Sequence, residues 1–134
     1  MPIIASNFKT NHTRKSTALF VNEVNNFLEK NKISNEVYIF PTSTSLDHFE
    51  TVPNLMIGVQ NAYPTTSGSF TGEIGTFQLN EFEIKTILIG HSERRHILGE
   101  TQETITKKYE FYKNLEYKII YCIGEPLEIK KQGI

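Results

Sequence analysis

The sequence predicts an α/β fold in which the strands of a parallel β-sheet alternate with helices. Short apolar runs recur along the chain, and longer stretches whose apolar side chains have helical spacing lie between them. The runs at Thr86–Ile89 (TILI) and residues 118–123 (KIIYCI) are almost continuously apolar, which is typical of strands covered on both faces. Strands and helices joined by short connections in this order form right-handed βαβ units. We therefore expect a single domain over residues 1–134.

The first unit is predicted to contain a strand over residues 2–6 and a helix over residues 17–30. Ile3 and Ile4 are β-branched residues that favour a strand, and Ser16 is a residue type that caps helices. Apolar side chains indicate one face of this helix: Phe20, Val24, Phe27 and Leu28.

Two further strands are predicted at residues 36–40 (EVYIF) and 56–60 (MIGVQ). Pro41 ends the first of them, because proline has no backbone N–H to donate to the sheet. A short helix is predicted between them at residues 45–49. Residues 61–75 then form a long polar loop, and a loop of more than ~12–15 residues is often functional.

The second half of the chain continues the alternation. A helix over residues 79–82 precedes the fourth strand, Thr86–Ile89, which ends at Gly90. Thr101 is expected to cap a helix that runs to about residue 114. Three side chains mark the apolar face of that helix: Ile105, Tyr109 and Tyr112.

The fifth strand is predicted at residues 118–123 and ends at Gly124. Residues 125–134 are expected to form a loop and the first turns of a fifth helix. The sequence thus predicts four complete strand–helix units and the beginning of a fifth.

Composition excludes several classes of function. The chain has 14 basic and 15 acidic residues, so it lacks the basic surplus by which proteins bind nucleic acid or anionic membranes. It contains no apolar stretch of ~18 residues, and residues 1–5 resemble no signal peptide. A single cysteine, Cys122, fits a reducing compartment. We expect a soluble, cytoplasmic protein with no nucleic-acid or membrane partner.

Polar side chains follow several predicted strands. Asn7 and Lys9 come after the first strand, Gln60 ends the third, and His91 and Glu93 follow the fourth. Because the carboxyl ends of parallel strands meet at one edge, we expect these side chains to converge.

This set of groups suits a small anionic substrate and proton transfer. Lys9 offers a cation for developing oxyanion charge. His91 offers a donor or acceptor near neutral pH, and Glu93 can hold Lys9 charged and oriented. A lone lysine or histidine at a strand end is more often structural, but several such ends together favour a functional site.

Four stretches carry a resemblance to a known family. They are IGHSERR at residues 89–95, SNFKTN at 6–11, QN at 60–61 with GSFTGEI at 68–74, and CIGE at 122–125. In this order and spacing they resemble the triosephosphate isomerase family. Phe8 and Thr10 depart from the family's usual tryptophan and methionine, beside the positions expected to act.

The resemblance implies a (β/α)₈ barrel, the TIM barrel, of which this chain holds about the first four and a half βα units. It implies interconversion of D-glyceraldehyde 3-phosphate and dihydroxyacetone phosphate, in glycolysis and gluconeogenesis, by proton transfer through an enediolate. It implies no metal and no organic cofactor. The partner molecule is then a small phosphorylated triose.

The resemblance also implies roles for individual residues. His91 is the electrophile, at the start of a short helix over residues 92–95; this family is the standard example of a histidine kept neutral by a helix N-terminus. Lys9 faces the substrate oxygens and phosphate, and Asn7 helps to bind the substrate. Glu93 and Gln60 lie behind these groups and support them.

A homodimer is implied as well. Loop 61–75 would insert into a neighbouring subunit beside its catalytic residues. Four residues are expected at this contact: Phe70, Thr71, Glu73 and Arg94. Two of them, Glu73 and Arg94, are expected to form an ion pair within or between subunits.

A complete barrel takes roughly 200–250 residues or more, whereas this chain has 134. The family's catalytic glutamate after strand six, its lid and its phosphate-binding turns have no counterpart in the sequence, so the isolated chain is predicted to be inactive. The alternative is a non-catalytic half-barrel that pairs with a complementary chain or with itself. Another sugar-phosphate isomerase or lyase is a weaker alternative, because the motif at residues 89–95 argues against it.

Overall fold

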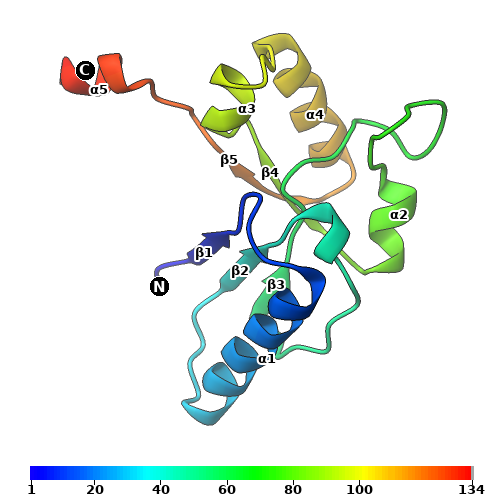
Figure 1. Cartoon of the computed structure of the whole chain (residues 1–134), viewed down its shortest axis with the longest axis vertical. Coiled ribbons are helices and arrows are strands. Elements are labelled where there is room, and N and C mark those ends of the chain that lie inside the picture. The colour runs from blue at the N-terminus through cyan, green and yellow to red at the C-terminus, as the bar shows by residue number, and fades with distance from the viewer. Residues whose placement is uncertain (134) are drawn as a thin grey trace.

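The computed structural model describes residues 1–133 and is built of alternating strands and helices (Figure 1). The strands and the 3₁₀ turn are β1 (Ile4–Asn7), β2 (Val37–Phe40), η1 (Ser43–Ser45), β3 (Leu55–Ile57), β4 (Thr86–Ile89) and β5 (Lys118–Tyr121). The helices are α1 (Arg14–Lys30), α2 (Thr76–Glu81), α3 (Ser92–His96), α4 (Gln102–Asn114) and α5 (Leu127–Lys131). The α/β class predicted from the sequence is confirmed.

All strand pairs are parallel and follow chain order. β1, β2 and β3 form one sheet, and β4 pairs with β5 in a second. An isolated bridge between Val59 and Ile87 joins the two sheets. Val59 donates its N–H to the Thr86 carbonyl at 2.9 Å and accepts from Leu88 N–H at 3.0 Å. The five strands therefore make one parallel array in chain order, as the barrel implied by the resemblance requires.

The array curves, and helices cover its outer face. Figure 1 shows α1 beside β1–β3, and α3 and α4 beside β4–β5, while α5 lies at the end of an extended segment. β2 and β5 are not neighbours in the array, yet Lys118 Nζ lies 3.3 Å from Glu36 Oε2 across the inner face. This contact requires the sheet to bend toward itself.

Three apolar clusters form the core. One packs α1 on the outer face of β1–β3, the second packs α2 and α4 on β4, and the third fills the inner face with Tyr38, Phe40 and Leu88. β2 and β4 are buried throughout, as apolar runs covered on both faces should be. β5 is only half-buried, contrary to the expectation, because it has a neighbouring strand on one side alone.

Several element boundaries differ from the prediction. Helix α1 begins one turn earlier than expected, because Thr13, not Ser16, is its cap. Thr13 Oγ1 accepts from Ser16 N–H, and Ser16 Oγ accepts from Thr13 N–H in return. The helix expected at residues 45–49 is absent, and the chain makes only η1 there. Asp47 instead turns its side chain to His48 N–H and to Arg14, which competes with helix formation.

Gly58 leaves room for the buried ring of Phe40. A Cβ added at Gly58 would lie 2.7 Å from Phe40 Cδ1 and 3.0 Å from the Thr86 carbonyl oxygen. We expect Gly58→Ala to lower the free energy of unfolding by about 1–3 kcal/mol, as overpacking of a close-packed core does. Urea denaturation followed by circular dichroism measures this.

The control for Gly58 is its combination with Phe40→Leu, which removes the clashing ring. The double variant should lose less stability than the sum of the two single variants. Additive losses would show that the ring is not the cause.

Within residues 1–133, no helix combines the length and the apolar character needed to cross a membrane.

Candidate active site at the carboxyl edge of the sheet

The structure brings together the polar side chains that follow β1, β3 and β4. They line a cleft of about 150 Å³ at the carboxyl edge of the sheet. Apolar side chains of Leu88 and Leu98 also line it. Six of the predicted site residues are in its lining: Asn7, Lys9, Gln60, His91, Glu93 and Arg94. The predicted convergence of strand ends is therefore present.

The loop after β1 holds Lys9 in a left-handed backbone conformation, with φ of 55°. Lys9 donates its N–H to Asn7 Oδ1 at 2.9 Å, which closes a tight turn. Gln60 donates both hydrogens of its Nε2 amide, to the carbonyls of Lys9 at 2.8 Å and Phe40 at 2.9 Å. A non-glycine residue at positive φ is strained, so these contacts fix the point from which the Lys9 side chain extends.

Lys9 and Glu93 form an ion pair across the cleft, with Lys9 Nζ 2.8 Å from Glu93 Oε1. The hydrogen bond from Lys9 holds the pKa of the Glu93 carboxyl below its ordinary value. Both side chains stay partly exposed, so the pair orients the ammonium while leaving it open to solvent.

The pKa of Glu93 offers a direct test of this pair. In Lys9→Met we expect it to rise back toward the ordinary glutamate value of about 4.3, because the donor and the positive charge are removed. A carboxyl NMR titration of the 134-residue chain measures this change. Lys15→Met, an exposed change on α1, should leave the Glu93 titration where it was, and an unchanged pKa in Lys9→Met would refute the pairing.

His91 is the N-cap of α3, as the expected helix over residues 92–95 requires. Its Nδ1 accepts the backbone N–H of Glu93 at 3.2 Å. An Nδ1 that accepts carries no proton, so the neutral imidazole carries its proton on Nε2. The ring is thus arranged to donate a hydrogen bond from Nε2 while it is uncharged.

Loop 61–75 is ordered by hydrogen bonds within the loop and by one from α4. Tyr63 N–H donates to the Ile74 carbonyl at 2.8 Å, and the Tyr112 hydroxyl anchors the Tyr63 carbonyl from α4. The Tyr63 and Phe70 rings pack at 4.5 Å between centroids, and both Phe70 and Thr71 are exposed. The loop therefore presents a preformed surface at its tip.

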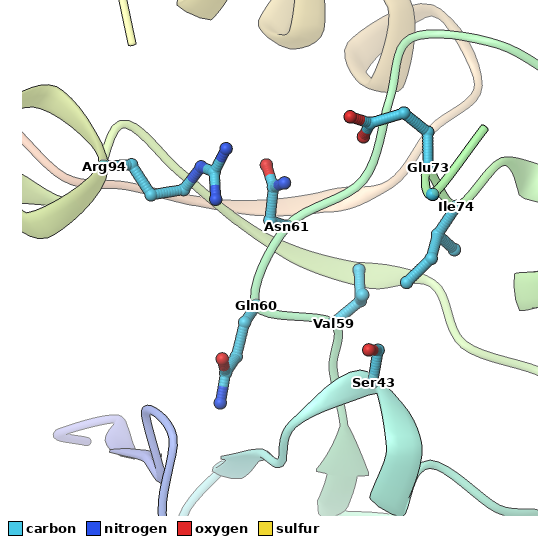
Figure 2. A pocket seen from close by; sticks show the side chains of 8 residues that line it. Ser43, Val59, Gln60, Asn61, Glu73, Ile74 and Arg94 are labelled. Carbon is cyan, nitrogen blue, oxygen red and sulfur yellow. The ribbon is translucent and has the colours of Figure 1, made fainter. Parts of the chain in front are cut away.

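A cavity of about 230 Å³ separates this loop from the ends of β3 and β4. Figure 2 shows Arg94 and Glu73 on either side of Asn61 around it. The expected ion pair between Glu73 and Arg94 is not formed within the chain, because Arg94 Nε donates to Glu100 Oε2 at 2.7 Å.

A buried polar network behind the cleft was not predicted. Glu100 Oε2 accepts from Arg94 and from Lys108 Nζ at 2.8 Å, and Lys108 also donates to Asn61 Oδ1 at 2.7 Å. The network joins α4 to the ends of β3 and β4. A signal was present in the sequence: Lys108 lies three residues after Ile105 and four before Tyr112, on the apolar face of its helix.

Among residues 1–133, no group of three or more histidine, cysteine, aspartate or glutamate side chains could hold a metal ion.

Comparison with known proteins gives one consistent result. The family model described as triosephosphate isomerase matches residues 2–134. A triosephosphate isomerase of Sulfurimonas denitrificans is 57% identical over 131 residues, which cover 98% of this chain and 54% of that protein. That of Wolinella succinogenes is 52% identical over 132 residues, which cover 98% of this chain and 57% of that protein. That of Helicobacter hepaticus is 47% identical over 137 residues, which cover 99% of this chain and 57% of that protein. The chain spans about half the length of the curated relatives it matches.

Proposed function

Since this chain belongs to the triosephosphate isomerase family, we propose that it supplies the amino-terminal half of a triose-phosphate isomerase site. The reaction interconverts D-glyceraldehyde 3-phosphate and dihydroxyacetone phosphate through an enediolate. The observation that carries the proposal is the cleft in which Lys9 and His91 face the same space.

Each group has a defined task in this proposal. The Lys9 ammonium, oriented by Glu93, binds substrate oxygens and stabilises negative charge as it develops. The Nε2–H of His91 polarises the substrate carbonyl and shuttles protons between the two oxygens of the enediolate. A neutral imidazole suits this task because its acidity is close to that of an enediol. Asn7 helps to bind the substrate, and Gln60 holds the Lys9 backbone.

The carboxylate that moves the proton between carbons is not assigned to any residue of this chain. Glu125 matches a different position of the family's pattern, and Glu93 is engaged with Lys9. We therefore propose that the 134 residues on their own do not catalyse the reaction.

A chimera tests the proposal. Residues 1–134 are joined to the part of the Sulfurimonas denitrificans relative that follows its region of similarity. We expect the chimera to isomerise both triose phosphates in a coupled assay and the 134-residue chain alone to match buffer. An inactive, folded chimera would overturn the proposed function, and turnover by the isolated chain would overturn the second part.

In the active protein we propose a cytoplasmic homodimer formed through loop 61–75. The exposed tip residues Phe70 and Thr71 support this, since a soluble loop gains little from presenting a phenylalanine to water. Glu73 and Arg94 flank the adjoining cavity and would contribute to the same contact. Sedimentation of the chimera, with Phe70→Ser as the comparison, measures the dimer.

The alternative, a non-catalytic half-barrel that assembles with another chain, is favoured by one observation. The two outer strands of the array are incompletely covered: Ile4 in β1 is 52% exposed, and Ile123 after β5 is 81% exposed. Such strands pair readily with other chains. A compact monomer of the 134-residue chain in sedimentation would count against this alternative.

A further inference from the structure

The side chain of Arg95 passes between two glycines at the ends of β4 and β5. Gly90 has φ of 80° and Gly124 has φ of 62°. A Cβ at Gly90 would lie 2.6 Å from Arg95 Nη2, and a Cβ at Gly124 would lie 2.5 Å from Arg95 Cδ. Both positions therefore require glycine for two reasons: the positive φ of the backbone, and the lack of space for a Cβ beside the Arg95 side chain.

The guanidinium of Arg95 joins three segments. Its Nε donates to the Gly90 carbonyl at 2.6 Å, and its Nη2 donates to the Cys122 carbonyl at 3.0 Å. Its Nη1 donates to Gln102 Oε1 at 2.7 Å, at the start of α4. Arginine alone offers this planar fork of donors, so no other side chain could make the same set of contacts.

These contacts enclose His91. The Gly90 carbonyl belongs to the peptide unit that precedes His91, and the Arg95 side chain holds it. The backbone N–H of Arg95 donates to the carbonyl of His91 itself at 3.1 Å. Arg95 is therefore hydrogen-bonded to the peptide unit before His91 through its side chain and to the one after it through its backbone N–H.

The helix that carries His91 needs such an anchor. Helix α3 has only five residues, Ser92–His96, and so short a helix is not stable by itself. The last residues of α3 contact the segment that follows β5. Arg95 donates to the Cys122 carbonyl, and His96 Nε2 lies 3.0 Å from the Gly124 carbonyl oxygen. The hydrogen bond from Glu93 N–H to His91 Nδ1 depends on the first turn of this helix.

We propose that Arg95 is a positioning residue for His91. It clamps Gly90 to the end of β5, and it thereby keeps the first turn of α3 formed and the His91 proton on Nε2. The contribution of Arg95 to catalysis rests on the proposed function, in which His91 is the electrophile. The effect of Arg95 on the His91 imidazole does not depend on that function.

NMR of the imidazole nitrogens in the 134-residue chain tests this. At a pH above which its imidazole signals no longer change, His91 should show a single tautomer with its proton on Nε2. In Arg95→Met we expect the Nδ1 and Nε2 signals to move toward each other, as the two tautomers become mixed. Comparison with His91→Gln assigns the signals.

Matched variants separate positioning from general stability. Arg95→Lys keeps the charge but can reach only one of the two carbonyls, so its signals should lie between those of the unmodified chain and Arg95→Met. Arg14→Met removes the exposed pair with Asp47, and Leu28→Ala weakens the core under α1. Both should leave the His91 tautomer unchanged. A tautomer that is equally pure in Arg95→Met would overturn the proposal.

Two further measurements apply if Arg95→Met does not fold. Gly124→Ala displaces the Arg95 side chain without removing it and should mix the tautomers in the same way. In the unmodified chain, the Arg95 Nε–H should exchange with solvent at least tenfold more slowly than that of the exposed Arg14. Equal exchange rates would overturn the proposal. An inactive chimera with a pure His91 tautomer would instead refute the proposed function and leave this inference standing.

Discussion

The free energy of unfolding is expected to fall by about 3–5 kcal/mol when Lys108 is replaced by methionine, because the change removes one of the two cations that pair with a buried carboxylate. The side chain of Lys108 is 5% exposed and that of Glu100 is 3% exposed, and their charged atoms lie 2.8 Å apart. Arg94 remains as a second partner of Glu100, but Asn61 also loses its hydrogen bond from Lys108. Urea denaturation followed by circular dichroism measures the loss.

The neighbouring lysine provides the control. Lys107 pairs with Glu103 on the exposed side of the same helix, where the two side chains are 67% and 80% exposed. Lys107→Met should change the stability by no more than about 0.5 kcal/mol, as exposed helix pairs do. Equal losses in the two variants would mean that burial of the Lys108 pair contributes nothing.

The stability loss in Lys108→Met should depend on pH. Burial alone would raise the pKa of Glu100, but Lys108 and Arg94 outweigh burial and hold it below the ordinary value. Because the pKa of Glu100 is lower in the folded protein than in the unfolded one, the ionised carboxylate stabilises the fold at pH values above its unfolded-state pKa of about 4.3. This stabilisation is lost as the pH falls through the pKa of Glu100 in the folded protein. Without Lys108 the carboxyl binds a proton more readily, so the loss measured near neutral pH should shrink as the pH approaches 4.5. A loss that is constant over this range would contradict the assignment.

Catalysis by the chimera should fall about 10²–10³-fold in kcat when Lys9 is replaced by methionine, as the loss of one donor to developing oxyanion charge does. The ammonium of Lys9 lines the cleft and is held there by Glu93 at 2.8 Å. Steady-state kinetics in both directions measure the fall. Lys15→Met removes an equal charge from exposed α1 and should leave kcat/KM within twofold. A Lys9→Met chimera that keeps its rate would remove Lys9 from the proposed mechanism.

The repeating pattern of the chain was enough to predict its five strands, and their sequential order is the one that the family's barrel implied. Apolar runs such as Thr86–Ile89 are typical of strands covered on both faces, and the groups that follow the strands meet at one edge. The boundaries of the elements were less predictable, because caps depend on competing side chains. Thr13 and Ser16 both have capping chemistry, and only their reciprocal hydrogen bonds decide that the helix starts at the earlier one.

The residues behind the candidate site were harder to predict for a different reason. Lys9, His91 and Glu93 follow strands directly, so their meeting is a consequence of topology. Lys108 and Glu100 belong to one segment, but Lys108 reaches Asn61 only because α4 packs against the end of β3, which a one-dimensional pattern does not contain. Among the described residues Arg94 pairs with Glu100, not with Glu73, and a pair of Glu73 with Arg94 between subunits stays a prediction.

The Val59–Ile87 bridge has a consequence for how the molecule opens. The cluster under α1 lies on one side of it and nearly all of the cluster under α2 and α4 on the other. The inner-face cluster of Tyr38, Phe40 and Leu88 spans both sides, and no ladder longer than this bridge connects β3 to β4. Amide hydrogen exchange should therefore reveal two cooperative units with different opening free energies, divided at residues 58–59. Lys9 belongs to one unit and His91 to the other. The two halves of the candidate site are then held at a fixed separation only while both units are closed.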